Sequence, residues 1–163
     1  LGVKYSTFVN SGSSANFISI KILQILNKNT QKNEIIIPTL TWVSDVNSII
    51  MHGFKPIFVD INLSNLSMDT NQIIKKISRK TLAVFITHAQ GFNGLNDNFL
   101  KELKKRKVHL IEDVCESHGA KHKNKKYYFA FCFGLVTIPI KSFSVRSQGS
   151  SMHTKIMAEM IAL

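Results

Sequence analysis

Two kinds of apolar pattern alternate along most of the chain. Short, uninterrupted apolar runs are typical of buried strands, and longer segments with apolar residues three and four positions apart are typical of helices. The expected strands are residues 8–10, 34–37, 56–59, 82–86 and 108–111. The expected helices are residues 15–26, residues 42–51, one capped by Asp69, and one that opens at Asn96 or Asp97 and runs through Lys105.

This alternation predicts a three-layer α/β/α sandwich with a mostly parallel sheet. Each helix should turn an apolar face to the sheet. For the first three helices, we expect that face to contain Ile18, Ile22, Ile25, Leu26, Val43, Val46, Ile49, Ile50, Ile73 and Ile77. We interpret residues 1–134 as part of one α/β domain and residues 135–163 as a divergent tail, in which the pattern assigns no elements.

The formal net charge of +11 raises nucleic-acid binding as a hypothesis. The basic residues fall in short runs at 75–80, 101–107 and 121–126, without the interleaved aromatic residues typical of single-strand binding. The first two runs lie at the ends of expected helices, where cations complement the helix dipole. We therefore favour a solvated basic surface over a nucleic-acid site. The third run resembles an exposed turn, which can also attract anionic substrates.

The location of the protein is expected to be cytoplasmic and away from membranes. No apolar run reaches the ~18 residues of a membrane span. The two cysteines, Cys115 and Cys132, provide neither a disulfide framework nor a metal-binding spacing. Such sparse cysteine content is typical of a reducing compartment.

Polar residues follow four of the expected strands, and the carboxyl ends of parallel strands are where α/β sheets bind ligands. Ser13 and Ser14 lie between a strand and a helix, where they can hold a phosphate or simply cap the helix. Trp42, the only tryptophan, can cover a ligand ring or pack in the core. His88 can contact a ligand or make structural hydrogen bonds.

Asp113 and Glu116 follow the strand expected at 108–111. A carboxylate at the end of a buried strand is unfavourable unless a cation or hydrogen-bond donors compensate it. Asp113 is therefore a candidate partner of a bound cation. The alternative is that both carboxylates accept only local backbone N–H groups.

In order along the chain, these segments resemble the DegT/DnrJ/EryC1/StrS sugar aminotransferases. The resemblance covers about residues 5–128. Its motifs are Asn10-Ser11-Gly12-Ser13-Ser14-Ala15-Asn16, Pro38-x-x-Thr41-Trp42, Pro56-Ile57-Phe58-Val59-Asp60-Ile61, Thr87-His88-x-x-Gly91 and Glu112-Asp113-x-x-Glu116-Ser117-His118-Gly119-Ala120. The first and last motifs also resemble the keto-deoxysugar 3-dehydratase branch, in which a histidine replaces the Schiff-base lysine.

The resemblance implies a fold-type I enzyme that uses pyridoxal 5′-phosphate (PLP) on nucleotide-linked keto sugars, in deoxy- and amino-sugar or lipopolysaccharide biosynthesis. It implies that Asp113 pairs with the pyridine nitrogen, that Ser13 and Ser14 hold the phosphate, and that Trp42 stacks on the ring. Glu116 falls near the ring hydroxyl, where many members carry Gln, and His88 matches a family histidine. The resemblance also implies a homodimer, and a chain that corresponds to part of the large domain without the small C-terminal domain.

The residue that would carry the chemistry is not located by this resemblance. Ser147 occupies the place of the Schiff-base lysine, and no Gly-Gly pair follows. Lys155 and His153 are the candidate catalytic residues. Three alternatives stay open: a transaminase, a dehydratase, or a non-catalytic remnant of either. A reading-frame shift near Gly134 is one hypothesis for the change of pattern, and resequencing that finds no Gly-Gly segment in either alternative frame would contradict it.

Overall fold

The computed structural model describes residues 9–117, 121–122, 125–126 and 136–137. Its centre is a five-stranded sheet with the strand order β2-β1-β5-β6-β9. The strands β2, β1, β5 and β6 run parallel, and β9 pairs with β6 in the antiparallel direction. Their bounds are β1 (Glu34–Pro38), β2 (Lys55–Val59), β5 (Thr81–Thr87), β6 (His109–Asp113) and β9 (Val136–Thr137).

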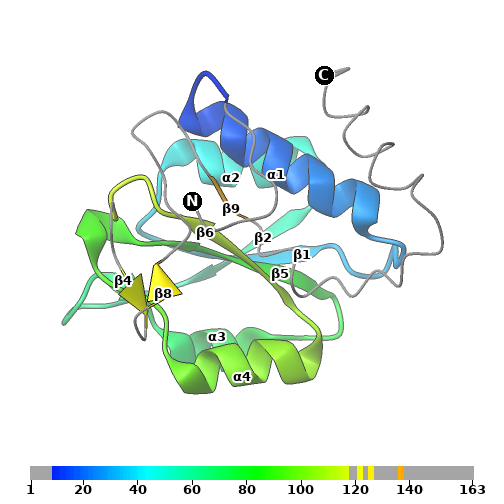
Figure 1. Cartoon of the computed structure of the whole chain (residues 1–163). Coiled ribbons are helices and arrows are strands. Elements are labelled where there is room, and N and C mark those ends of the chain that lie inside the picture. Colours follow the sequence, from blue (N-terminus) through cyan, green and yellow to red (C-terminus); the bar gives the residue numbers. More distant parts are fainter. Residues whose placement is uncertain (1–8, 118–120, 123–124, 127–135, 138–163) are drawn as a thin grey trace.

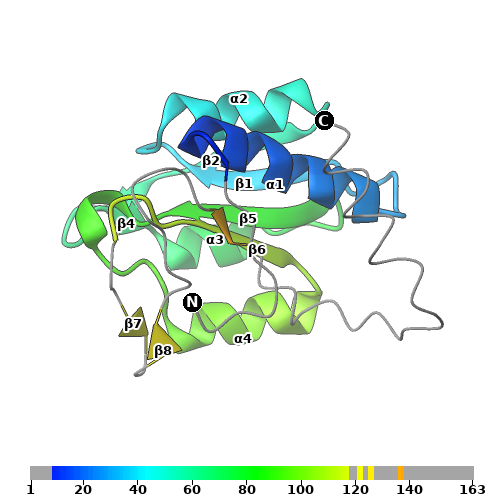
Figure 2. The same cartoon turned by 45° about the horizontal axis from the view of Figure 1, so that its top comes forward.

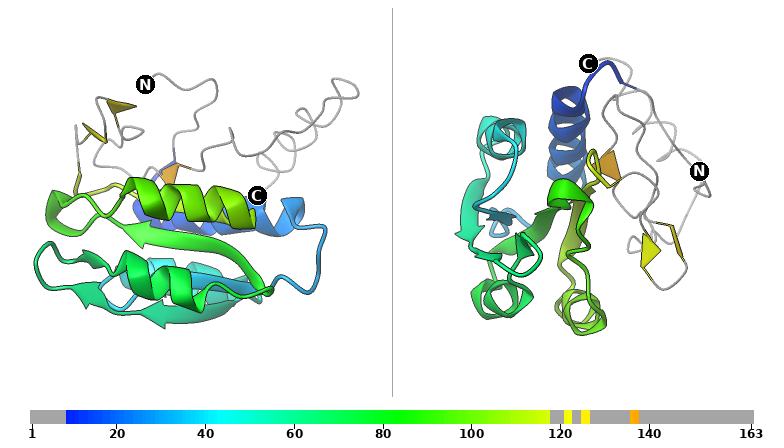
Figure 3. Two further views of the ribbon diagram at one scale, coloured as in Figure 1. Left: turned by 90° about the horizontal axis from the view of Figure 1, so that it is seen from below. Right: turned by 90° about the vertical axis from the view of Figure 1, so that its left-hand side faces the viewer.

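Helices cover both faces of this sheet, which confirms the predicted three-layer α/β/α arrangement (Figures 1 and 2). The first face carries α1 (Gly12–Leu26) and α2 (Val43–Met51), and the second carries α3 (Thr70–Lys76) and α4 (Asp97–Arg106). The end-on view in Figure 3 shows the helix pairs on opposite sides of the strands. The short elements are β3 (Ile61–Asn62), β4 (Ser67–Met68), the 3-10 helix η1 (Ala89–Gly91), β7 (Lys121–His122) and β8 (Lys125–Lys126).

The central strands are buried on both sides, as a parallel sheet between helices requires. Successive side chains of a strand point to opposite faces. Ile35 and Ile37 of β1 therefore pack with α1 and α2, whereas Ile36 packs with α3 and α4. Because β1 and β5 face a core on each side, they read as continuous apolar runs instead of alternating ones.

The expected boundaries of the elements are mostly confirmed within a few residues, because the helix ends carry clear local signals. Asp69 caps α3 by accepting the backbone N–H groups of Asn71 and Gln72. Asn96 caps α4 by accepting the N–H of Phe99 at 2.9 Å. Of the strand expected at residues 8–10, Val9 and Asn10 are not in a strand, and Phe8 lies outside the described residues.

The expected apolar faces of the first two helices are only partly correct, since Ile49 is buried and Val46 packs against the core but other members are exposed. Val43 and Ile50 are exposed, and Ile25 is also exposed. Polar residues occupy the buried face in their place, among them Asn16 and Ser19 of α1 and Asp45 and Ser48 of α2. The two helices pack against each other through hydrogen bonds from Asn16 to Ser44 and Asp45, as well as through apolar side chains of the same core.

Most basic residues of α3 and α4 lie where cations complement the helix dipole, in the last turn. Lys75 and Lys76 lie in the last turn of α3, and Lys104, Lys105 and Arg106 lie in the last turn of α4. Within the described ranges, no helix has both the length and the apolar content needed to cross a membrane.

The packing of α4 gives a testable prediction for stability. Phe99 is fully buried between α4 and the sheet, so Phe99→Ala should lower the free energy of unfolding by about 3–5 kcal/mol. Phe92→Ala is the control, because Phe92 is 47% exposed and its loss should have a much smaller effect. Urea unfolding followed by circular dichroism measures both variants. Equal destabilisation of the two would contradict the packing described for α4.

Candidate functional site

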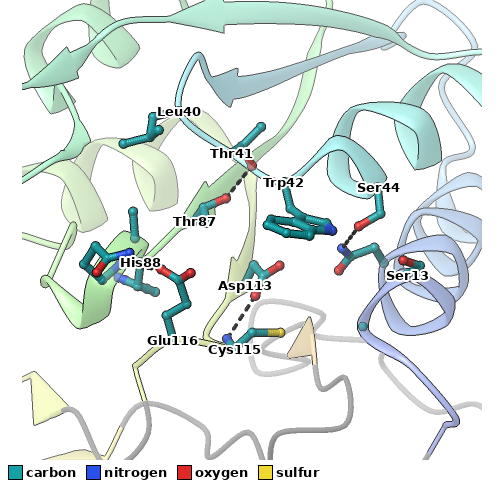
Figure 4. A pocket seen from close by; sticks show the side chains of 14 residues that line it. Ser13, Leu40, Thr41, Trp42, Ser44, Thr87, His88, Asp113, Cys115 and Glu116 are labelled. Atoms are coloured by element: carbon teal, nitrogen blue, oxygen red, sulfur yellow. Dashed lines mark hydrogen bonds between the residues drawn. The ribbon is translucent and has the colours of Figure 1, made fainter.

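The carboxyl ends of β1, β5 and β6 lie beside one another at one edge of the sheet, and the N-terminus of α1 lies at the same edge (Figures 1 and 4). The register places Thr87, the last residue of β5, directly opposite Asp113, the last residue of β6. A cavity of about 510 Å³ opens there. Five of the expected site residues line it, namely Ser13, Trp42, His88, Asp113 and Glu116.

The N-terminus of α1 provides one wall of the cavity. Ser11 caps the helix, and its side chain accepts the backbone N–H of Ser14. The N–H groups of Gly12 and Ser13, in the first turn, have no partner within the helix, so they are available to an anion. The exposed side chain of Ser13 lies beside them. Ser14 is placed differently, because its hydroxyl donates to Asn10 Oδ1 at 2.7 Å and does not line the cavity.

Trp42 lies on the rim of the cavity and is 64% exposed. It is the residue that immediately precedes α2, and its carbonyl oxygen accepts the backbone N–H of Asp45. The alternative of a core tryptophan is therefore wrong. In Figure 4 the indole ring extends from the loop after β1 over the space between Asp113 and Ser13. An aromatic face at this position can cover a planar ligand.

Asp113 is buried at the end of β6, and Oδ1 accepts the backbone N–H of Cys115 at 3.0 Å. Among the described residues, no side-chain or backbone donor hydrogen-bonds to Oδ2, and Asp113 lines the cavity. Glu116 differs, because it is exposed and Oε2 accepts the backbone N–H of Gln90. Gln90 has a left-handed backbone with φ +55°, so Glu116 supports an unusual turn in η1.

His88 is buried, and both of its ring nitrogens contact the protein. Nε2 lies 3.0 Å from Oε2 of the buried Glu112, and the backbone N–H of Gly94 donates to Nδ1 at 3.3 Å. Since Nδ1 accepts a hydrogen bond, the ring proton belongs on Nε2, which donates to Glu112. These contacts tie β5 to β6 and to the following loop. They favour the structural role for His88 over direct contact with a ligand.

Sequence reasoning missed the hydrogen-bond network beneath Trp42. Asp45 of α2 is fully buried, and its carboxyl oxygens contact the side chains of Asn16, Thr41 and Thr87. The pKa of Asp45 is raised to about 7, chiefly by burial and also by the negative charge of Asp113, and hydrogen bonds from Thr41, Thr87 and the backbone of Trp42 oppose the shift. The sequence did contain a signal for the burial of Asp45. Asp45 lies four residues before Ile49, so the two residues share one face of the helix, and Ile49 is buried.

The structure does not describe the candidate catalytic residues. Lys155 and His153, and also Ser147, lie outside the described residues. Within the described residues, no cluster of His, Cys, Asp and Glu side chains is arranged to hold a metal ion.

The donor set of the cavity fits an elongated ligand with an anionic end, a flat ring and a cationic group. Free N–H groups of α1 suit the anion, the exposed face of Trp42 suits the ring, and Oδ2 of Asp113 suits the cation. Asn16 adds a further polar atom, since its buried Oδ1 has no hydrogen-bond partner among the described residues. PLP has these three parts, so the residues present fit this cofactor.

Comparison with known proteins identifies relatives of this chain among sugar-modifying enzymes. GDP-perosamine synthase of Escherichia coli O157:H7 is 34% identical over 123 residues, which cover 76% of this chain and 33% of the relative. GDP-4-keto-6-deoxy-D-mannose 3-dehydratase of Escherichia coli O55:H7 is 33% identical over 137 residues, which cover 83% and 34%. The chain thus spans about a third of the length of these curated relatives.

Solved structures show the same relationship. The E. coli GDP-4-keto-6-deoxy-D-mannose-3-dehydratase with bound hydrated PLP superposes with a TM-score of 0.68 at 31% identity, over 77% of this chain and 33% of that one. The aminotransferase PseC of Helicobacter pylori, involved in pseudoaminic acid biosynthesis, gives a TM-score of 0.67 at 25% identity, over 77% and 33%. The family model of these enzymes matches residues 1–129, and this chain belongs to the DegT/DnrJ/EryC1/StrS aminotransferase family.

Proposed function

We propose that this chain forms the PLP-binding part of an enzyme that modifies nucleotide-linked keto sugars, by amino transfer or alternatively by 3-dehydration. The observation that carries the proposal is the shared cavity, in which the free oxygen of Asp113 faces the same space as the N-terminus of α1 and the exposed Trp42. The perosamine synthase and the 3-dehydratase among the relatives support the substrate class. The cytoplasm is the proposed location, since the two cysteines fit a reducing compartment.

Each residue has a proposed task. The first-turn N–H groups of α1, with the hydroxyl of Ser13, hold the phosphate at the positive end of the helix dipole. Asp113 accepts the N–H of the pyridine ring and keeps that nitrogen protonated, while Trp42 covers the ring. When bound, the cofactor supplies an electron sink for reactions at a carbon next to nitrogen. Ser14 supports the phosphate site indirectly, through its hydrogen bonds to Asn10 and Ser11.

The complete enzyme is proposed to be a homodimer. The outer surface of α2 and the residue before it expose apolar side chains that the described fold does not cover. Trp42, Val43, Ile50 and Met51 are each more than half exposed. Exposed apolar groups clustered on one helix are typical of a surface that binds another protein, and a second copy is the proposed partner.

Asp113→Asn should weaken PLP binding about tenfold to a hundredfold, because the hydrogen bond to a charged partner is worth about 1.5–3 kcal/mol. Titration of the purified chain with PLP, followed by absorbance, measures this change. Glu102→Gln removes the same charge from α4, on the far face of the sheet, and should bind like the wild type. Unchanged affinity in Asp113→Asn would refute the proposed pairing with the ring nitrogen.

Trp42 should report ligand binding directly, because it is the only tryptophan in the chain. PLP is expected to quench its fluorescence at lower concentration than pyridoxal, which lacks the phosphate. Ser13→Glu should raise the concentration of PLP needed for half-quenching about tenfold, since it places a negative charge beside the phosphate. Ser64→Glu, in the exposed turn between β3 and β4, is the charge-matched control. Equal quenching by PLP and pyridoxal would contradict a phosphate site at α1.

The choice between the catalytic alternatives depends on Lys155 and His153. Borohydride treatment of the PLP-loaded chain, followed by peptide mapping, separates them. A stable adduct on Lys155 supports the transaminase. Recovery of unmodified Lys155 supports the dehydratase or the non-catalytic remnant.

A further inference from the structure

A ring of three oxygen atoms lies at the base of the cavity. Thr41 Oγ1 and Thr87 Oγ1 are 2.7 Å apart, and Thr87 Oγ1 lies 3.1 Å from Asp45 Oδ2. Thr41 Oγ1 also hydrogen-bonds to Asp45 Oδ2 and closes the ring. Figure 4 shows the contact between the two threonines beside Trp42. The ring connects the loop after β1, the end of β5 and the first turn of α2.

Counting protons identifies the charge state that satisfies this ring. Three oxygen–oxygen contacts need three protons, and the two threonine hydroxyls supply two of them. If Asp45 is ionised, one contact is left as two oxygen atoms facing each other without a proton. If Asp45 is protonated on Oδ2, it donates to Thr41, Thr41 donates to Thr87, and Thr87 donates back to Asp45. Every contact in the ring is then a hydrogen bond.

The other oxygen of Asp45 agrees with this assignment. A neutral carboxylic acid has one hydroxyl oxygen and one carbonyl oxygen. Oδ1 accepts the side-chain N–H of Asn16, as a carbonyl oxygen does. The environment also disfavours a charge, because Asp45 is fully buried and the described groups that hydrogen-bond its carboxyl are uncharged: the side chains of Asn16, Thr41 and Thr87 and the backbone of Trp42, whose hydrogen bond partly opposes protonation. Within the described residues, the charged group that acts on Asp45 is Asp113 of β6, which is negative and favours the protonated form further.

We propose that Asp45 is a neutral carboxylic acid that closes a hydrogen-bonded ring with Thr41 and Thr87, and so acts as a positioning residue for the cavity. The ring holds Thr41, which is adjacent to Trp42 in the chain, against the end of β5. A neutral Asp45 also removes a second negative charge from the neighbourhood of Asp113, which suits a ligand with a single cationic group. This inference concerns the ligand-free chain and does not depend on the proposed function.

The proposal predicts a particular pH dependence of stability. The pKa of Asp45 rises from 3.8 to about 7 on folding, so the native state binds this proton more tightly than the unfolded state. The stabilisation is complete below about pH 4, decreases as the pH rises toward about 7, and is absent above it. Asp45→Asn should remove this dependence, because the amide donates to both threonines and its oxygen still accepts from Asn16.

The experiment uses the full chain without ligand. Thermal unfolding of the wild type should lose roughly 4 °C or more of Tm between about pH 5 and pH 8, relative to Asp45→Asn over the same range. Asp113→Asn is the matched variant that removes the neighbouring charge. It should shift the pH-dependent loss of stability to lower pH than in the wild type, because the negative charge of Asp113 no longer raises the pKa of Asp45. Parallel pH profiles for the wild type and Asp45→Asn would overturn the proposal.

Infrared spectroscopy provides a second measurement that does not require a variant to fold. At about pH 6, ordinary carboxyl groups are ionised, so a protonated Asp45 should give a carboxylic-acid C=O band that disappears as the pH is raised above about 8. Trp42 emission should change over the same pH range, because the ring positions the loop that carries it. Absence of the band at about pH 6 would overturn the proposal even if Asp45→Asn did not fold.

Discussion

The parallel pairing of β5 with β1 and β6 is the constraint on which the site depends. Parallel strands end at the same edge of a sheet, and the register of β5 with β6 places Thr87 opposite Asp113. The helix connections then bring the first turn of α1 and the loop with Trp42 to that edge. Residues separated by a hundred positions in the chain thereby line one cavity. This register also sets Asp113 at the cavity, beside the end of β5.

The contact between α1 and α2 includes buried polar side chains beside its apolar ones. Asn16 of α1 donates to Ser44 and Asp45 of α2, and Asp45 in turn reaches β5 through Thr87. Buried polar groups are favourable only when they have partners, so these side chains define one orientation of the two helices. The same network forms the base of the cavity. The packing of the first face and the shape of the site therefore depend on shared residues.

The predictions from sequence succeeded where a local signal decides the outcome. Asn96 and Asp69 cap helices as expected, because a cap is a contact between residues two and three positions apart. The expected apolar faces of the first two helices were only partly correct, since Ile49 is buried as expected but Val43 and Ile50 are exposed while Asp45 is buried. Periodicity identifies which residues of a helix share a face. The element that packs against the helix decides which of its faces is buried. Here the partner is another helix that presents polar groups.

The sequence by itself determined the α/β alternation and most of the strands, and it identified Asp113 and Trp42 near their carboxyl ends. These follow from hydrophobic periods and local turn signals, which act over a few residues. Only the tertiary structure decided that Trp42 is exposed, that His88 is engaged by Glu112 and Gly94, and that Asp45 joins the site. Burial and hydrogen bonding depend on side chains that are distant in sequence, and the packing of helices on the sheet brings these side chains together.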